Sequence, residues 1–248
     1  MPSPPLLIAP RSAAALLMLA LASVSPAQSR PTHDPERARL ITEDIPRFWA
    51  AYDARATLGS ASAFDSLYLR PGSRGLRDFT TLRITDATAL TRTVASAERY
   101  YASIRASTER VATQDSTIRA AFRRLKALHP DAVFPDVYFV VGRMTSGGTT
   151  SDAGLLIGVE MYGRTTDSAL TGLSAWHRDV LAPVERLPAI VAHELCHYQQ
   201  TSRRNETLLA RALREGMCDF VSELAAGAQI NEVATAYGLA NEHALWEE

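Results

Sequence analysis

A short motif of histidine and glutamate is the part of this 248-residue sequence best suited to chemistry. Residues 189–200 read AIVAHELCHYQQ, so His193 and His197 lie four positions apart and Glu194 directly follows the first. Residues four apart share one face of a helix, so both imidazoles can bind one cation. Glu194, about 100° round the helix from His193, can address a metal-bound water without binding the ion. The motif favours a hydrolytic metal site; a buried helix with two hydrogen-bonded histidines is the alternative.

A following acidic helix can supply a third ligand, because catalytic zinc sites use three protein ligands and keep one position for water. Residues 213–224 read LREGMCDFVSEL, and the chain before Glu215 is long enough to turn at about residues 202–205 and return alongside. Asp219, one turn later, can accept a hydrogen bond from the outer nitrogen of a zinc-bound histidine. The apolar neighbours of both carboxylates predict burial, which requires a metal or a cationic partner. The alternative is a solvated helix face.

These segments resemble the gluzincins, zinc peptidases in which a glutamate on a following helix completes the HExxH motif. More closely, they resemble a family of predicted Zn-dependent proteases related to the gliding-motility protein GldB. The resemblance extends to GGTTSDAGLLIGVEMYG (147–163) and NEHALWEE (241–248), and covers roughly residues 135–248. It implies that His193, His197 and Glu215 bind Zn²⁺ and that Glu194 is the general base.

The resemblance also implies a strand beside the active helix that pairs with an extended substrate. Residues 153–162, including Leu155 and Ile157, are the candidate strand, with Gly147 and Gly148 at its mouth. A central strand with no free edge is the alternative.

An electrophile that stabilises the oxyanion is expected as well, and in this family type it is a His or a Tyr. His243 is the first candidate in this sequence, ahead of Tyr237 and Tyr198. Each of the three can equally be a packing or surface residue.

Periodicity predicts mostly helices in the first half of the chain and two buried strands in the middle. The expected class is α+β, helix-rich and zincin-like, with a small β-sheet beside the HExxH helix. The expected helices are residues 36–58, 62–69, 85–106, 113–128, 188–200, 206–226, 231–239 and 242 onward; the expected strands are 137–144 and 153–162, separated by a loop at 145–151, and 173–183 is expected to be irregular.

The N-terminus predicts export. A lone Arg11 precedes an apolar run at residues 13–24, and Ser25-Pro26-Ala27 offers a cleavage site, so residues 1–27 read as a signal peptide cut near Ala27. The run is shorter than the ~20 residues that span a bilayer. No cysteine follows it, so we expect no lipid attachment at the mature N-terminus. The mature protein is expected to be periplasmic or extracellular.

Residues 28–35 read as a flexible leader, and 36–248 as a single metallohydrolase domain. Its helical N-terminal part covers 36–130 and its zincin-like part 135–248. The formal net charge of −1 provides no basic field for nucleic acid. The two cysteines, Cys196 and Cys218, either form a disulfide or pack as small apolar residues between helices.

Three functions agree with these features. The main prediction is a secreted zinc metallopeptidase acting on a peptide or protein substrate. The alternatives are a zinc hydrolase of a non-peptide bond and a non-catalytic, metal-containing scaffold protein of the cell envelope related to motility. Glu194 favours an enzyme, because a purely structural site has no use for that carboxylate. A protein group in the fourth coordination position, from Cys196 or Cys218, would favour the scaffold.

Overall fold

The computed structural model describes residues 30–200 and 207–247. The expected signal peptide, its cleavage site near Ala27 and the expected turn at 202–205 lie outside the described residues. Part of the expected leader makes defined contacts, because Thr32 pairs with Phe134 and His33 Nδ1 lies 3.1 Å from the carbonyl oxygen of Ala132.

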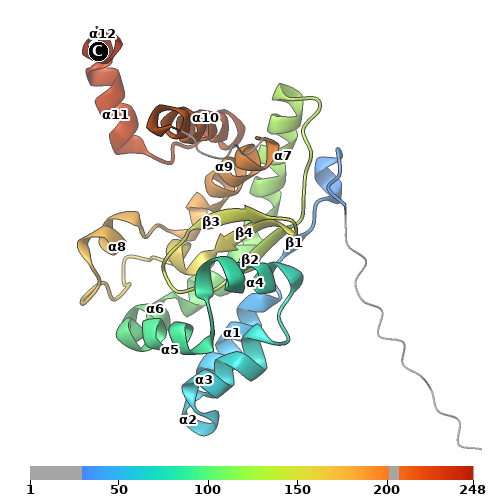
Figure 1. Ribbon diagram of the computed structural model, residues 1–248, viewed down its shortest axis with the longest axis vertical. Helices are drawn as coiled ribbons and strands as arrows, with labels where there is room; N and C mark the ends of the chain where they lie inside the picture. The colour runs from blue at the N-terminus through green and yellow to red at the C-terminus, as the bar shows by residue number, and fades with distance from the viewer. Residues whose placement is uncertain (1–29, 201–206, 248) are drawn as a thin grey trace, which may run out of the picture.

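A small mixed sheet lies at the centre of the molecule (Figure 1). Its strands are β1 (Leu40–Ile41), β2 (Val137–Val140), β3 (Gly148–Ser151) and β4 (Gly154–Gly158), in the order β1-β2-β4-β3. The first three in this order run parallel, and β3 is antiparallel to β4. Among the described residues, β3 therefore has one paired edge and one free edge.

Helices surround the sheet (Figure 1). The α-helices are α1 (Asp44–Asp53), α2 (Arg55–Leu58), α3 (Ser60–Ala63), α4 (Arg74–Phe79), α5 (Ala87–Ser96), α6 (Glu98–Glu109), α7 (Asp115–Leu128), α8 (Ala175–Val180), α9 (Leu187–Gln199), α10 (Leu208–Ala226), α11 (Glu232–Ala240) and α12 (Glu242–Glu247). Short 3₁₀ segments are η1 (Pro35–Arg37), η4 (Val111–Gln114), η5 (Val159–Tyr162) and η6 (Val184–Arg186), and π-helical segments are η2 (Phe64–Leu69) and η3 (Thr80–Ile84).

Two glycines bring helices onto opposite faces of the sheet. A Cβ on Gly75 of α4 would lie 2.1 Å from the ring of Tyr138, and Tyr138 pairs with Leu156. A Cβ on Gly148 would lie 2.3 Å from Glu194 of α9, and Gly148 pairs with Ile157. Successive strand residues point to opposite faces, so α4 and α9 cover different faces of β4.

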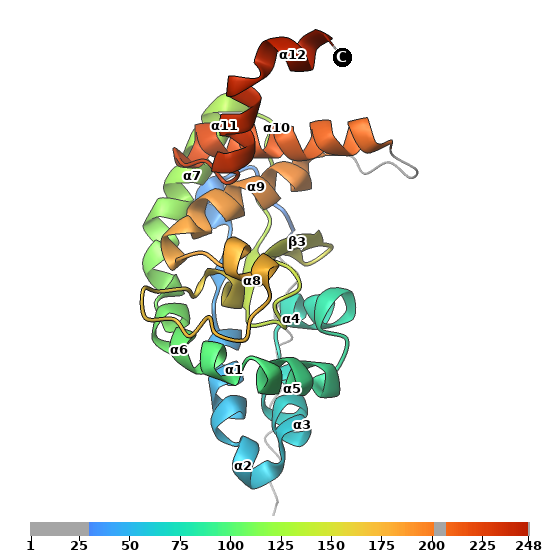
Figure 2. The ribbon, with the colours of Figure 1, turned by 90° about the vertical axis from the view of Figure 1, so that its left-hand side faces the viewer.

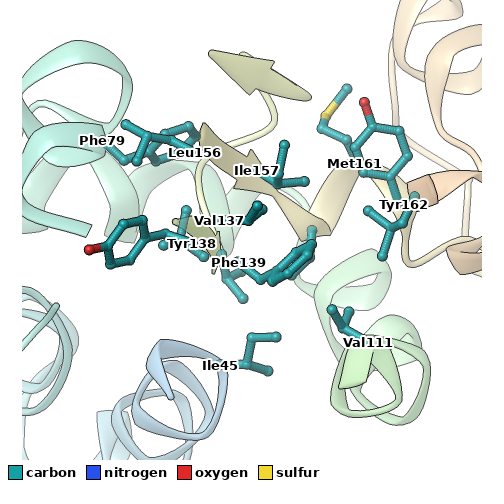
Figure 3. Packing of buried hydrophobic residues seen from close by; sticks show 14 of the residues in the cluster. Ile45, Phe79, Val111, Val137, Tyr138, Phe139, Leu156, Ile157, Met161 and Tyr162 are labelled. Carbon is teal, nitrogen blue, oxygen red and sulfur yellow. The ribbon is translucent and has the colours of Figure 1, made fainter. Parts of the chain in front are cut away.

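The sheet is held by apolar packing. All residues of β2 and β4 are buried, and Val137, Phe139 and Ile157 belong to one hydrophobic cluster with Ile45 of α1 and Val111 of η4 (Figure 3). Burial of such side chains contributes roughly 1.5–3 kcal/mol each, so this core gives the strands a rigid position.

The two motif helices begin and end where the sequence supplies the signals. Pro188 occupies the first turn of α9, where a missing N–H costs nothing. Thr207 caps α10 by accepting from the Ala210 N–H, and Gly227, with φ of 74°, ends it in the left-handed region. The expected returning helix at 206–226 is thus confirmed, and Figure 2 shows α10 lying across α9.

Several local expectations are wrong. The expected helix at 36–58 is interrupted by β1, whose residues pair with Val137 and Tyr138. The expected loop at 145–151 contains the strand β3, and the expected strand at 153–162 ends at Gly158 and continues as η5. The irregular stretch at 173–183 contains α8, which Ser174 caps.

The helix-rich α+β class and the small sheet beside α9 are confirmed, while zincin likeness stays a prediction. The last two helices, α11 and α12, extend away from the sheet (Figures 1 and 2). Within the described ranges, no helix combines the length and the apolar character needed to cross a bilayer.

Candidate metal centre

Helices α9 and α10 bring His193, His197 and Glu215 together. His197 Nε2 lies 3.0 Å from His193 Nε2 and 3.0 Å from Glu215 Oε2, and His193 Nε2 lies 3.6 Å from the same oxygen. The three ligand atoms all lie within 4.8 Å of one another, so the group could hold a metal ion. Two imidazole nitrogens and a carboxylate oxygen that converge in this way form a donor set that transition metals prefer.

The outer nitrogens of both histidines face oxygen atoms. His193 Nδ1 lies 2.9 Å from Asp219 Oδ1, and His197 Nδ1 lies 3.0 Å from Gln200 Oε1. An acceptor at Nδ1 favours the tautomer whose Nε2 lone pair is free for a cation. Burial lowers the pKa of His193, and the nearby His197 adds to this effect, so the neutral, ligating form is favoured. Asp219 thus lies beside the outer nitrogen of a histidine, as predicted, whereas the contact of Gln200 with His197 was not predicted.

Burial of Glu215 was predicted wrongly. Its side chain is 53% exposed. The apolar neighbours that suggested burial, Met217 and Phe220, are themselves 49% and 60% exposed. Pairing with the two imidazoles therefore fixes the Glu215 carboxylate, and an apolar surrounding does not.

Glu194 lies on the sheet side of α9, against the edge strand. Gly148 allows the close approach, because any side chain there would collide with the Glu194 carboxyl group. Burial raises the pKa of Glu194 to about 7; the Glu215 carboxylate also raises it, whereas His197 and Arg83 lower it. A carboxyl group poised near neutrality beside this candidate ligand group is suited to accepting and returning a proton.

A disulfide joins the two helices of the site. Cys196 lies next to His197 on α9, and Cys218 lies one position before Asp219 on α10. Of the two readings of the cysteine pair, the bonded one is confirmed. Neither sulfur is a thiol that can bind a metal strongly, so neither cysteine is expected to fill the fourth coordination position.

A cleft of about 410 Å³ lies in front of the ligand group. It is lined by the three ligand residues and Glu194, by Gly148, Thr149 and Thr150 of the edge strand, and by Arg83, Tyr198, Gln200 and Arg214. Arg83 was not predicted as a site residue, because it lies in a segment without a motif. Thr149 and Thr150 were missed because their Gly/Ser/Thr-rich neighbourhood predicted a loop.

Several predicted substrate residues lie elsewhere. Leu155 and Ile157 are fully buried in β4, which pairs with β2 on one side and β3 on the other and so has no free edge. The central-strand alternative was therefore correct, and the free edge belongs to β3. Gly147 packs against Tyr162, whose hydroxyl a Cβ would meet at 2.1 Å, and does not line the cleft.

Two of the three residues predicted as the oxyanion-stabilising electrophile also lie away from the cleft. His243 lies on α12, is 92% exposed and contacts Glu247 at 3.2 Å, so it does not line the cleft. Tyr237 lies on α11, in a different surface depression beside Arg186. Of the three candidates only Tyr198 borders the cleft.

Comparison with protein families places residues 78–242 in the family described as gliding motility protein GldB, so the chain belongs to that family. Comparisons with curated proteins and with solved structures find no match. The GldB part of the sequence resemblance is thus confirmed, but the match begins at residue 78, well before the expected start near 135, and ends at 242. The family description names motility and no peptidase, so the gluzincin part stays a prediction.

The label of the family, GldB_lipo, is that of a lipoprotein group. In this chain neither cysteine lies near the apolar run at 13–24, because Cys196 and Cys218 are far along the sequence and form the disulfide. A structural disulfide fits a location outside the cytoplasm, where oxidising conditions preserve such bonds.

Proposed function

We propose that this GldB-family chain is an exported zinc metallopeptidase whose ion is held by His193, His197 and Glu215. The donor set supports zinc, which takes two imidazoles and one carboxylate in many hydrolases and leaves a position for water. Ligand bonds of 2.0–2.1 Å in a tetrahedron imply ligand atoms about 3.3 Å apart. The observed separations of 3.0, 3.0 and 3.6 Å surround that value.

The observation that carries the proposal is Glu194, which lines the same cleft as the three ligand residues without belonging to the group. A zinc ion held by His193, His197 and Glu215 would supply an activated water in this cleft. Glu194 would accept a proton there and return it to the leaving amine, and Asp219 and Gln200 would keep the imidazoles oriented. The free edge of β3 can pair with the backbone of an extended peptide beside Glu194.

A second candidate is favoured by the family description, which names motility. In that reading the chain is a non-catalytic, metal-containing protein of the cell envelope, and the ion fixes α9 against α10. Hydrolysis of a non-peptide bond at the same ion is a third reading, since the ligand set does not select the substrate.

A digest of a broad peptide library separates these readings. We expect zinc-loaded wild-type protein to cleave peptides and Glu194→Gln to keep its zinc but lose cleavage by at least 10²-fold, the usual contribution of a general base. Glu185→Gln serves as the control, because it is the same type of substitution in η6 at a residue that does not line the cleft. If wild type and Glu194→Gln both bind zinc and both leave the library intact, the peptidase proposal fails and the motility-related scaffold is favoured.

A further inference from the structure

One cation of the cleft has no carboxylate partner. The guanidinium of Arg83, at the end of η3, lines the cleft and donates to Thr149 Oγ1 at 3.1 Å. Among the residues that the structure describes, no carboxylate lies within ion-pair distance of it. Arginine presents several N–H donors in a planar fork that matches a carboxylate, and one hydroxyl satisfies only one of them.

Neither acidic group of the cleft forms an ion pair with Arg83, although the charge of Arg83 lowers the pKa of Glu194. Glu215 contacts both imidazoles, and Glu194 is packed against Gly148 on the sheet side. A divalent ion would offset the charge of these two glutamates. Arg83, which lines the cleft, then adds a positive charge that these two glutamates do not offset. Such a cleft attracts a negatively charged ligand.

The strand register shows which side chains of β3, the free edge strand, face Arg83. Thr149 pairs with Leu156 and therefore points to the face of the sheet that α4 covers, whereas Gly148 points to α9 and Glu194. Arg83 thus bonds a side chain that leaves β3 on the face opposite to Gly148, while Arg83 lines the same cleft as Glu194. A peptide extended along β3 would point alternate residues toward the ligand group and toward Arg83.

We infer that Arg83 is a specificity-determining residue that binds a carboxylate of the substrate next to the bond held at the metal. The carboxylate comes either from an acidic side chain or from a free C terminus, since both present the same chemistry to a guanidinium. That the ligand is a substrate rests on the proposed function. Binding of a carboxylate by Arg83 does not depend on catalysis.

The test uses acetylated hexapeptide pools of random sequence. One arm compares pools with a free C-terminal carboxylate against pools with a C-terminal amide; the other compares pools with Glu against Gln at each position. Each pair is passed over immobilised, zinc-loaded Glu194→Gln protein, and retained peptides are quantified by mass spectrometry. Cleavage of the same pools by wild-type protein is measured separately.

We expect carboxylate-bearing peptides to be retained roughly tenfold or more over their neutral partners in at least one arm, because hydrogen bonds to charged groups contribute about 1.5–3 kcal/mol. Adding Arg83→Gln should remove this preference, and Arg83→Lys should keep part of it. Arg92→Gln, a change at an exposed arginine of α5 that does not line the cleft, should leave it intact.

Zinc content and the thermal midpoint are checked for each variant, so that loss of folding is not mistaken for loss of recognition. Equal retention in both arms, or a preference that survives Arg83→Gln, overturns the inference. Absence of cleavage alongside a preference that depends on Arg83 would overturn the peptidase proposal alone, because retention does not require turnover.

Discussion

The two imidazoles of the ligand group are held by different partners. His193 faces the carboxylate of Asp219, whereas His197 faces the neutral amide oxygen of Gln200. A carboxylate behind an imidazole makes the ring a more basic ligand than an amide does. Asp219 is also placed by Asn231, whose Nδ2 donates to Asp219 Oδ2 at 2.5 Å.

Asp219→Asn should therefore weaken zinc binding about 10–100-fold without removing any ligand. The substitution keeps the size of the side chain but removes its charge. Competition with a zinc chelator measures the affinity, with Asp131→Asn, at an exposed position after α7, as the matched control. An affinity equal to that of wild type would mean that Asp219 does not support His193.

At the scale of elements, the relation between α9 and α10 decides whether a site exists, because each helix carries only part of the ligand set. The disulfide joins them across 22 residues of sequence. A cross-link of this span stabilises the folded state by about 3 kcal/mol, chiefly by restricting the unfolded chain.

Replacing both cysteines by alanine should lower the free energy of unfolding by about 3 kcal/mol, as measured by denaturant titration of metal-free protein. Reduced wild-type protein should behave in the same way. Equal stability of the double variant and the oxidised wild type would show that packing alone holds α10 against α9.

The same elements show what could be predicted from the sequence. Helices α7 and α9 follow from apolar periodicity, from His129-Pro130 after α7 and from Pro188 at the start of α9, all of which are local signals. Strand β1 could not be predicted, because only its pairing with the distant Val137 and Tyr138 defines it. Strand β3 was hidden by its Gly, Ser and Thr content, which is typical of turns.

The candidate site was predicted in the same measure. His197 lies one helical turn after His193, and Asp219 lies one turn after Glu215, so each of these pairs follows from helical spacing. Glu215 itself was assigned from the acidic helix that follows the motif and from the resemblance to the gluzincins. Arg83 could not, because a contact with Thr149, 66 residues further on, depends on how η3 meets the sheet.

At the scale of the whole molecule, a buried carboxyl group ties the loop after β2 to η5. Glu160 accepts hydrogen bonds from the Gly142 and Met144 N–H groups at 2.7 and 3.0 Å. Burial raises the pKa of Glu160 to about 7, although these hydrogen bonds lower it. The folded state therefore holds a proton that the unfolded chain, with its ordinary value of 4.5, has released.

Because the folded-state pKa is the higher one, this group stabilises the fold least at high pH: its contribution falls as pH rises from about 4.5 to about 7 and then stays constant. Between pH 5 and pH 8 the free energy of unfolding should fall by an amount on the order of 3 kcal/mol. In Glu160→Gln this fall should be absent. Both proteins should be metal-free and carry Glu194→Gln, since Glu194 acts in the same direction. An identical pH dependence in the two would show that Glu160 is not the group responsible.

The zinc content of the purified chain tests the proposed metal centre directly. Loaded with zinc and dialysed, wild-type protein should hold about one ion per chain, and His197→Ala and Glu215→Ala should each lose most of it, because each removes a ligand from a three-ligand site. His129→Ala, at a histidine outside the group, should keep the ion. Zinc content unchanged by both ligand substitutions would contradict the proposed metal centre and everything built on it.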